Sequence, residues 1–339
     1  MSNRSICFFD LDGTLDLNNP KLSAEIVKMS KMGVDFVTAT GRTNSYVLEI
    51  FRKNNIIPPK FIIADNGGSI YDCTQKKYIK RTYLPIDIRK MIIGEYVRIG
   101  GRVENIRYTD GNYVYAAENN EVRKYYEKEK SILYRPNPEI LNTIFDSTED
   151  ITKLTLAGQE SLMKEIIRYI EEHDLKCWTD MGTTKFPRKE RNNFRLDITD
   201  GKTSKGEAVQ FLTDFTGIYD FTCIGNGPND LSMFDYALRC NMPVIVVVNK
   251  DKGRISEESE ALIRQVVEDS KKYGSEDKVI IEHYPINGFV INLADRKTSR
   301  ERRRTFADTL RIKEIRKTTK IVRTSENLIK RVQHRGEEK

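Results

Sequence analysis

Five short apolar segments, separated by more polar sequence, set the pattern of the chain. They are rich in β-branched and aromatic residues and run over Ile6–Phe9, Val34–Ala39, Phe61–Ala64, Phe221–Ile224 and Val244–Val248. Continuous apolar runs of this length are typical of strands that are buried on both faces. Helical spacing is found between them, in Ala24–Met32, which stops at Gly33, and in Asn44–Lys53. The pattern predicts an α/β fold with a Rossmann-like parallel sheet that is covered by helices on both faces.

The middle of the chain has a different character. Strand-like segments are predicted at Val103–Tyr108, Asn112–Ala117, Ile151–Leu156, near Trp178 and at Phe194–Ile198, with helices at Glu121–Lys130 and Leu162–His173. This mixture predicts an α+β cap domain over residues 83–198. It would be inserted into a core domain that is formed by residues 1–82 and 199–295.

The positive charge of the chain is concentrated near its end. The net charge is +7, but 16 of the 57 Lys and Arg residues and only 6 of the 50 acidic residues lie within residues 296–339. Apolar Ile315, Val322 and Ile329 are seven residues apart in this tail, which predicts a basic amphipathic helix. Such a tail could bind an acidic partner, a nucleic acid or another subunit, or it could simply remain solvated.

No segment predicts a membrane span or an export signal. The longest clean apolar run, Val244–Val248, is far too short to cross a bilayer, and the first residues contain no extended apolar stretch. The five cysteines are scattered without metal-type spacing, which favours reduced thiols. We therefore expect a cytoplasmic protein.

The first apolar run ends in the sequence Asp10-Leu11-Asp12-Gly13-Thr14. Alternation along a strand would direct Asp10 and Asp12 to the same side, and Gly13 permits a sharp turn behind them. Two carboxylates in one site can divide the work of nucleophile and acid when their environments separate their pKa values. An acidic strand end followed by a glycine turn is the simpler alternative.

Three later stretches also place polar residues at the end of a predicted strand or at the start of a predicted helix. Thr40 follows the second run and precedes a helix, and Lys205 begins a helix in "KTSKGEA". The turn "CIGNGPND" carries Asn226, Asn229 and Asp230, whose oxygens suit Mg²⁺. Taken singly, each has a purely structural explanation: a helix N-cap for Thr40, a surface lysine for Lys205 and a polar turn for the last stretch. For Thr40 and Lys205 alone, that explanation is the preferred one.

Together, and in this order, the four stretches resemble the signature of the haloacid dehalogenase superfamily of phosphohydrolases. The long insertion between the Thr and Lys motifs resembles the cap of the Cof-type (IIB) branch, and "ADNGG" resembles its Asn-Gly turn. The stretch "CIGNGPNDLSMFDYALRCNMPVIVV" looks most like that of mannosyl-3-phosphoglycerate phosphatases. The resemblance covers residues 5–295 and leaves out the tail.

The resemblance implies a role for each motif residue. Asp10 would be the nucleophile and Asp12 the general acid and base, while Thr40 and Lys205 would hold the phosphoryl oxygens. Asp10, the main chain of Asp12, Asn226 and Asp230 would bind Mg²⁺. The substrate, a phosphorylated sugar or glycoside, would be contacted by residues around these motifs and in the cap: Gly41, Arg42, Asn66, Gly67, Arg188 and Asn229.

Two features leave other functions open. The family normally has Asp where this chain has Asn226, so the protein could instead be a catalytically weakened phospho-ligand binding protein. The basic tail would also suit a nucleic-acid-associated end phosphatase. Finally, the insertion carries a basic cluster, "TTKFPRKERNNFR", which includes Arg188 and Arg195. It is either a solvated loop or a grip for a second anionic group of the substrate.

Overall fold

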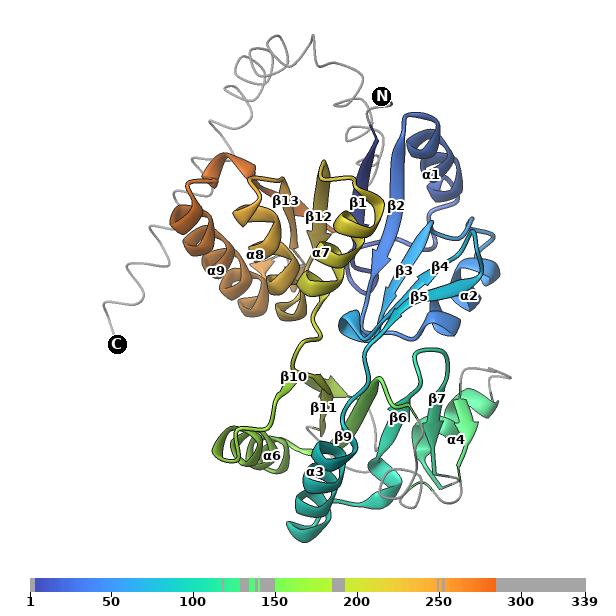
Figure 1. Ribbon diagram of the computed structural model, residues 1–339, viewed down its shortest axis with the longest axis vertical. Coiled ribbons are helices and arrows are strands. Elements are labelled where there is room, and N and C mark those ends of the chain that lie inside the picture. Colours follow the sequence, from blue (N-terminus) through green and yellow to red (C-terminus); the bar gives the residue numbers. More distant parts are fainter. Residues whose placement is uncertain are drawn as a thin grey trace. The chain divides into compact units, whose positions relative to one another are not determined.

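A computed structural model describes residues 4–117, 119–128, 134–137, 140, 150–184, 193–248, 250–251 and 254–284. The predicted tail, residues 296–339, lies outside these residues, as does Arg188. The described residues fall within one compact unit, residues 1–287, and form two main sheets (Figure 1).

The first sheet has eight strands in the order β16-β13-β12-β1-β2-β3-β4-β5. The pairings from β16 to β3 are parallel, and β4 and β5 join as an antiparallel hairpin. The strands are β1 (Ser5–Phe9), β2 (Val34–Ala39), β3 (Phe61–Ala64), β4 (Ser69–Asp72), β5 (Lys77–Arg81), β12 (Phe221–Gly225), β13 (Val244–Val248) and β16 (Val279–His283). The five predicted core strands are all present in this sheet.

Helices cover both faces of this sheet, which explains why its central strands are apolar throughout. They are α1 (Leu22–Lys31), α2 (Asn44–Lys53), α7 (Lys205–Thr216), α8 (Leu231–Arg239) and α9 (Glu257–Tyr273). On β1, Phe8 packs toward Phe221 and α8, whereas Phe9 packs toward Phe36 and through it toward α2. Short elements complete the core: η1 (Asp65–Gly67), η3 (Pro228–Asp230), η4 (Glu276–Lys278), β14 (Lys250–Asp251) and β15 (Arg254–Ile255).

The second sheet belongs to the segment between β5 and α7 and has the order β10-β11-β9-β6-β7-β8. Its elements are α3 (Ile86–Arg98), η2 (Val103–Asn105), β6 (Arg107–Thr109), β7 (Val114–Ala116), α4 (Glu121–Lys128), β8 (Tyr134–Pro136), β9 (Lys153–Gln159), α6 (Glu160–Glu172), β10 (Cys177–Thr184) and β11 (Asn193–Asp200). This cap sheet has a hydrophobic core of its own, built from α3, α6 and one sheet face.

Some predicted elements differ from the structure. The strand predicted over Val103–Tyr108 is wrong in its first half, because Val103–Asn105 form a 3-10 turn and the strand begins at Arg107. Apolar Val103 packs against the edge of the cap core without joining the sheet. The domain limits remain a prediction, and β11 continues to Asp200, two residues past the limit that we placed at 198. Within the part of the chain described here, no helix has the length and apolar character that crossing a bilayer would require.

Two glycines provide a matched test of the fold. Gly67 has φ +104°, and a Cβ atom there would lie 2.2 Å from the main-chain oxygen of Ser204, the residue that caps α7. Gly94 is exposed within α3, and a Cβ atom there would contact nothing. Gly67→Ala should therefore lower the free energy of unfolding by about 1–3 kcal/mol through backbone strain and a steric clash. Gly94→Ala should raise it by about 0.5–1 kcal/mol.

Urea unfolding of both variants checks this prediction. Equal effects of the two substitutions would contradict the close approach of η1 to α7.

Candidate active site

The two acidic residues after β1 occupy different environments at the same end of the sheet. The Asp10 amide donates to the Ile224 carbonyl at 2.8 Å, so the β1–β12 ladder extends to the start of the motif. Gly13 has φ 80° and turns the chain away, as predicted. The Asp10 side chain is buried, whereas that of Asp12 is 58% exposed. Both residues line one cavity, so the structure supplies an acidic pair with unequal solvation.

A buried lysine joins the first motif to the last. Lys205 is the first residue of α7, and its Nζ lies 2.7 Å from Asp10 Oδ1 and 2.6 Å from Asp230 Oδ1. All three residues are buried. Burial raises the pKa of Asp10 to about 7, although Lys205 opposes this shift. Burial lowers the pKa of Lys205, but the two carboxylates outweigh it and raise that pKa above its ordinary value, so the lysine stays cationic.

The turn after β12 is held together by its own acidic residue. Asp230 Oδ2 accepts hydrogen bonds from the amides of Asn226 and Gly227 at 2.8 and 3.0 Å. The hydroxyl of Thr14 donates to Asn226 Oδ1 at 2.9 Å and lies 3.4 Å from Asp10 Oδ2. Oxygen atoms of Asp10 and Asn226, more than 200 positions apart in the chain, thus meet at one hydroxyl.

These oxygens are of the kind that Mg²⁺ prefers, and three of the predicted ligands, Asp10, Asn226 and Asp230, are brought together around Thr14 and Lys205. Within the described residues there is no cluster of three or more His, Cys, Asp or Glu side chains that would hold a metal. Asn226 contributes an amide oxygen at this point, where Asp10 and Asp230 contribute carboxylates. The residues fit a cation site that contains fewer charged ligands than the family pattern.

The loop after β2 positions Arg42 over the exposed acid. Thr40 is buried, and its hydroxyl accepts a hydrogen bond from the Arg42 amide at 3.2 Å. The Arg42 guanidinium donates to both carboxylate oxygens of Asp12, at 2.8 and 3.2 Å, and lies 4.8 Å from the centre of the Tyr46 ring. The paired geometry fixes the orientation of the Asp12 side chain.

The predicted Asn-Gly turn lies behind the cavity wall. Asn66 is fully buried, and its Oδ1 accepts a hydrogen bond from Asn229 Nδ2 at 3.2 Å. It also lies 3.0 Å from the position that a Cβ atom on Gly41 would occupy. Asn66 therefore joins the loop after β2 to the turn after β12, while Gly67 contacts the cap of α7.

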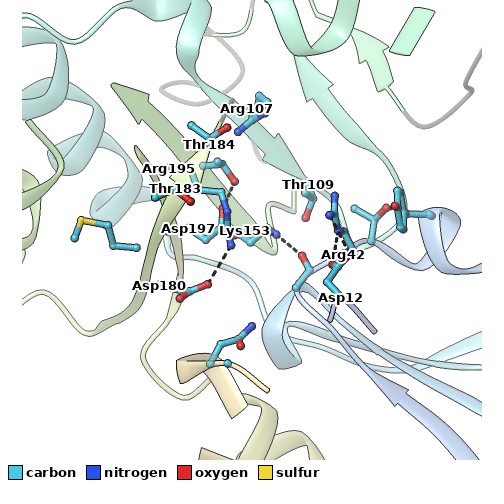
Figure 2. Close-up of a pocket in the computed structure, with 18 of the residues that line it drawn as sticks. Asp12, Arg42, Arg107, Thr109, Lys153, Asp180, Thr183, Thr184, Arg195 and Asp197 are labelled. Atoms are coloured by element: carbon cyan, nitrogen blue, oxygen red, sulfur yellow. Dashed lines mark hydrogen bonds and ion pairs between the residues drawn. The ribbon is translucent and has the colours of Figure 1, made fainter. Parts of the chain in front are cut away.

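The cavity has a volume of about 470 Å³ and lies between the strand ends of the core and the cap sheet (Figure 2). Six of the predicted site residues line it: Asp10, Asp12, Gly41, Arg42, Asn226 and Asn229. Thr40, Asn66, Gly67, Lys205 and Asp230 surround these residues without lining the cavity, and Arg188 lies outside the described residues. Of the basic cluster in the insertion, Arg195 is described, and it lines the cap side.

Sequence reasoning missed a polar network between core and cap. Asp65 is fully buried, and its Oδ2 accepts hydrogen bonds from the hydroxyls of Thr109 and Thr152 at 2.8 and 2.9 Å. Lys153 Nζ donates to the Gly41 carbonyl at 2.6 Å and lies 3.7 Å from Asp65 Oδ1. In the sequence, polar Lys153 and Thr155 alternate with apolar Leu154 and Leu156. This alternation was the signal that could have predicted a polar face of the sheet.

Comparison with known proteins identifies the family of this chain. Residues 7–243 match the model of the haloacid dehalogenase-like hydrolase family. The chain belongs to that family, so the predicted superfamily and α/β core are confirmed, and with them the enzyme class of a phosphatase.

Similar proteins include the 5-amino-6-(5-phospho-D-ribitylamino)uracil phosphatase YwtE of Bacillus subtilis, which is 29% identical over 67% of this chain and 83% of its own length. Among solved structures, a Thermotoga maritima protein is 22% identical over 86% of this chain and 97% of its own, with a TM-score of 0.61. A sugar phosphatase of haloacid dehalogenase subclass IIB is 18% identical over 86% of this chain and 98% of its own, with a TM-score of 0.56. The likeness to mannosyl-3-phosphoglycerate phosphatases remains a prediction.

The network around Lys153 generates a stability prediction. Lys153→Met would leave the buried carboxylates of Asp65 and Asp197 without this cation, so unfolding should become easier by about 3–5 kcal/mol. The matched control is Lys164→Met, because Lys164 pairs with Glu160 on an exposed helix face and contributes about 0.3–0.5 kcal/mol. Thermal unfolding of the two variants measures the difference. Similar losses of stability in both would contradict a stabilising role for the buried contacts of Lys153 with Asp65 and Asp197.

Proposed function

We propose that the protein is a Mg²⁺-dependent phosphatase that hydrolyses a small phosphorylated metabolite of the sugar phosphate or phosphoglycoside class through an aspartyl-phosphate intermediate. The observation that carries this proposal is the position of the Asp10 carboxylate. It lines a cavity that Asp12 also lines, and its Oδ1 lies 2.7 Å from Nζ of the buried Lys205. Two similar proteins, YwtE and the subclass IIB sugar phosphatase, are named as phosphatases of phosphorylated small molecules or sugars, which supports this class of substrate.

The first step transfers the phosphoryl group to the enzyme. Lys205 engages Oδ1 of Asp10, and the other oxygen, Oδ2, attacks phosphorus. The Asp10–phosphorus bond forms while the bond between phosphorus and the substrate oxygen breaks. Asp12 in its protonated form donates its proton to that leaving oxygen, so a neutral alcohol departs.

The second step returns Asp10 to its starting form. Asp12, now a carboxylate, removes a proton from a water molecule, and the oxygen of that water attacks phosphorus. The Asp10–phosphorus bond breaks and inorganic phosphate is released. In its carboxylate form, Asp12 is held in one orientation at the cavity wall by the Arg42 guanidinium, which binds both of its oxygens. Thr40 and Lys205 are proposed to stabilise the phosphoryl oxygens.

Mg²⁺ would be held by Asp10, the main-chain carbonyl of Asp12, Asn226 and Asp230. When bound, the ion would neutralise negative charge on the transferring phosphoryl group. The amide of Asn226 supplies an oxygen without a full charge, so we propose a weaker cation site than one with Asp at this position, and we favour a working enzyme over a binding protein. The nucleic-acid alternative depends on the tail, which lies outside the described residues.

Substitution of the acidic pair tests the mechanism. Asp10→Asn should abolish phosphate release because the nucleophile is lost, and Asp12→Asn should slow it by about 10²–10⁴-fold because only proton transfer is lost. Asp16→Asn, in the same loop but outside the cavity lining, is the control and should retain full activity. Phosphate release from a panel of sugar phosphates with Mg²⁺ measures all three. Unchanged turnover in Asp10→Asn would refute the proposed intermediate, and tight ligand binding by an inactive wild-type protein would favour the binding-protein alternative.

The cation site has its own test. Asn226→Asp should increase the affinity for Mg²⁺ by about tenfold or more, because a carboxylate is a harder and more strongly charged ligand than an amide. Asn229→Asp adds the same charge to the same turn and serves as the control for a general electrostatic effect. Calorimetric titration of both variants with Mg²⁺ in the absence of substrate reports affinity directly. Equal gains in the two variants would argue against direct ligation by residue 226.

A further inference from the structure

A row of charged and polar side chains crosses the cap sheet on the face that lines the cavity. The strand register places Arg107 of β6 opposite Thr155 of β9, Thr155 opposite Asp197 of β11, and Asp197 opposite Asp180 of β10. Residues directly opposite one another on adjacent strands point to the same side of a sheet. All four line the cavity that contains Asp10 and Asp12.

Burial of the other sheet face fixes this orientation. Tyr108, Leu154, Leu156, Leu196 and Ile198 alternate with the polar residues along the same strands, and they are almost fully buried in the cap core. A shift of one residue in the register would bring charges into that core. The charged row is therefore held toward the cavity by the packing of its apolar neighbours.

The negative charge of Asp197, the acid in the middle of the row, is compensated by neighbouring cations. Asp197 accepts a hydrogen bond from Thr155 at 2.6 Å, lies 3.5 Å from Lys153 Nζ and pairs with Arg195. Burial favours the protonated form of Asp197, but Lys153 and Arg195 outweigh it and lower its pKa to about 2. Asp197 is thus ionised, and it anchors two cations instead of repelling an anionic ligand.

The two arginines of this face differ in how they are engaged. Arg195 pairs with Asp197 and lies 3.6 Å from Asp180, yet 34% of its side chain is exposed above its small neighbours Ala157 and Gly182. Arg107 is half-buried, lines the cavity and helps to lower the pKa of Asp197 through its charge, but no ion pair or hydrogen bond of its side chain is found within the described part of the chain. Three cations and two carboxylates line the described cap side of the cavity, which leaves this side net positive.

Figure 2 shows how these groups are arranged. Arg107, Arg195 and Asp197 lie on one side, the Arg42–Asp12 pair lies on the other, and Lys153 lies between them. A phosphoryl group that reacts with Asp10 must sit on the core side. The cavity, at about 470 Å³, has room for the rest of a metabolite between the core and the cap arginines. A guanidinium group presents donors in a plane that matches a carboxylate or a phosphate.

We propose that Arg107, supported by Arg195, binds a second anionic group of the substrate, so that the preferred substrate is a phosphomonoester that carries an additional carboxylate or phosphate. This inference rests on the proposed phosphatase function and specifies its substrate class. Arg107 is then a specificity-determining residue: it contributes to substrate affinity and takes no part in proton transfer.

The test uses matched substrate pairs with the full-length chain and Mg²⁺. Glucose 6-phosphate is compared with 6-phosphogluconate, which adds a carboxylate, and fructose 6-phosphate with fructose 1,6-bisphosphate, which adds a phosphate. We expect the member with the second anionic group to have, in at least one pair, a kcat/KM about 10–100-fold higher, mainly through KM, as a charge-assisted contact would produce. Which pair shows the preference identifies the second anion.

Variants of Arg107 assign the preference to this side chain. Arg107→Met should abolish the preference, because kcat/KM should fall more for the member with the extra anionic group than for its partner, while Arg107→Lys should retain part of it. Arg135→Met is the control, because Arg135 lies in the same cap, packs on the Tyr113 ring and does not line the cavity. It should behave as the wild type. Circular dichroism and thermal unfolding of each variant show whether the cap is still folded.

The proposal is overturned if the wild type prefers the doubly anionic member in neither pair, or if a folded Arg107→Met variant keeps the wild-type ratio. The latter result would mean that Arg107 serves only the electrostatic balance of Asp197. Failure of the phosphatase function is recognised separately, as an absence of phosphate release from all four compounds. In that case, calorimetric binding of the same pairs to wild type and Arg107→Met decides the second-anion site without turnover.

Discussion

The ion triad of Asp10, Lys205 and Asp230 is the interaction on which the site depends. The lysine is fully buried, so its charge can be tolerated only while both carboxylates stay within contact distance. Removing either carboxylate would leave a charge poorly compensated in the protein interior. Three segments, the end of β1, the start of α7 and the turn after β12, are therefore bound to a single point, and that point is the proposed site of phosphoryl transfer.

The backbone around the triad is built to allow this convergence. The turn after β12 is closed by hydrogen bonds to Asp230 Oδ2, which leaves Oδ1 for Lys205. The start of α7 is brought close to η1 because Gly67 has no side chain. Asn66, next to it, joins Gly41 and Asn229 from behind the cavity. Residues that sequence analysis assigned to substrate contact thus also have a structural role, since they hold the loops that carry the acids.

A second buried charge connects the core to the cap. Lys153 contacts the Gly41 carbonyl and lies within ion-pair distance of Asp65 in the core and of Asp197 in the cap. The same lysine thereby connects the loop that carries Arg42 with the charged row of the cap sheet. Lys153 therefore contacts both the core side, where we propose the chemistry, and the cap side, where we propose recognition of the substrate.

The sequence by itself determined the core strands, the helices beside them and the strand-end motifs, because these depend on local apolar runs and on residues adjacent to them. It also indicated the inserted cap, although Val103–Asn105 were wrongly assigned to a strand. Only the tertiary structure showed that Arg42 pairs with Asp12, that Asp65 and Lys153 join core and cap, and that Arg107 shares a row with Thr155, Asp197 and Asp180. Strand pairing between distant segments decides these neighbours, and alternation within a single strand reveals that a face is polar without revealing what that face meets.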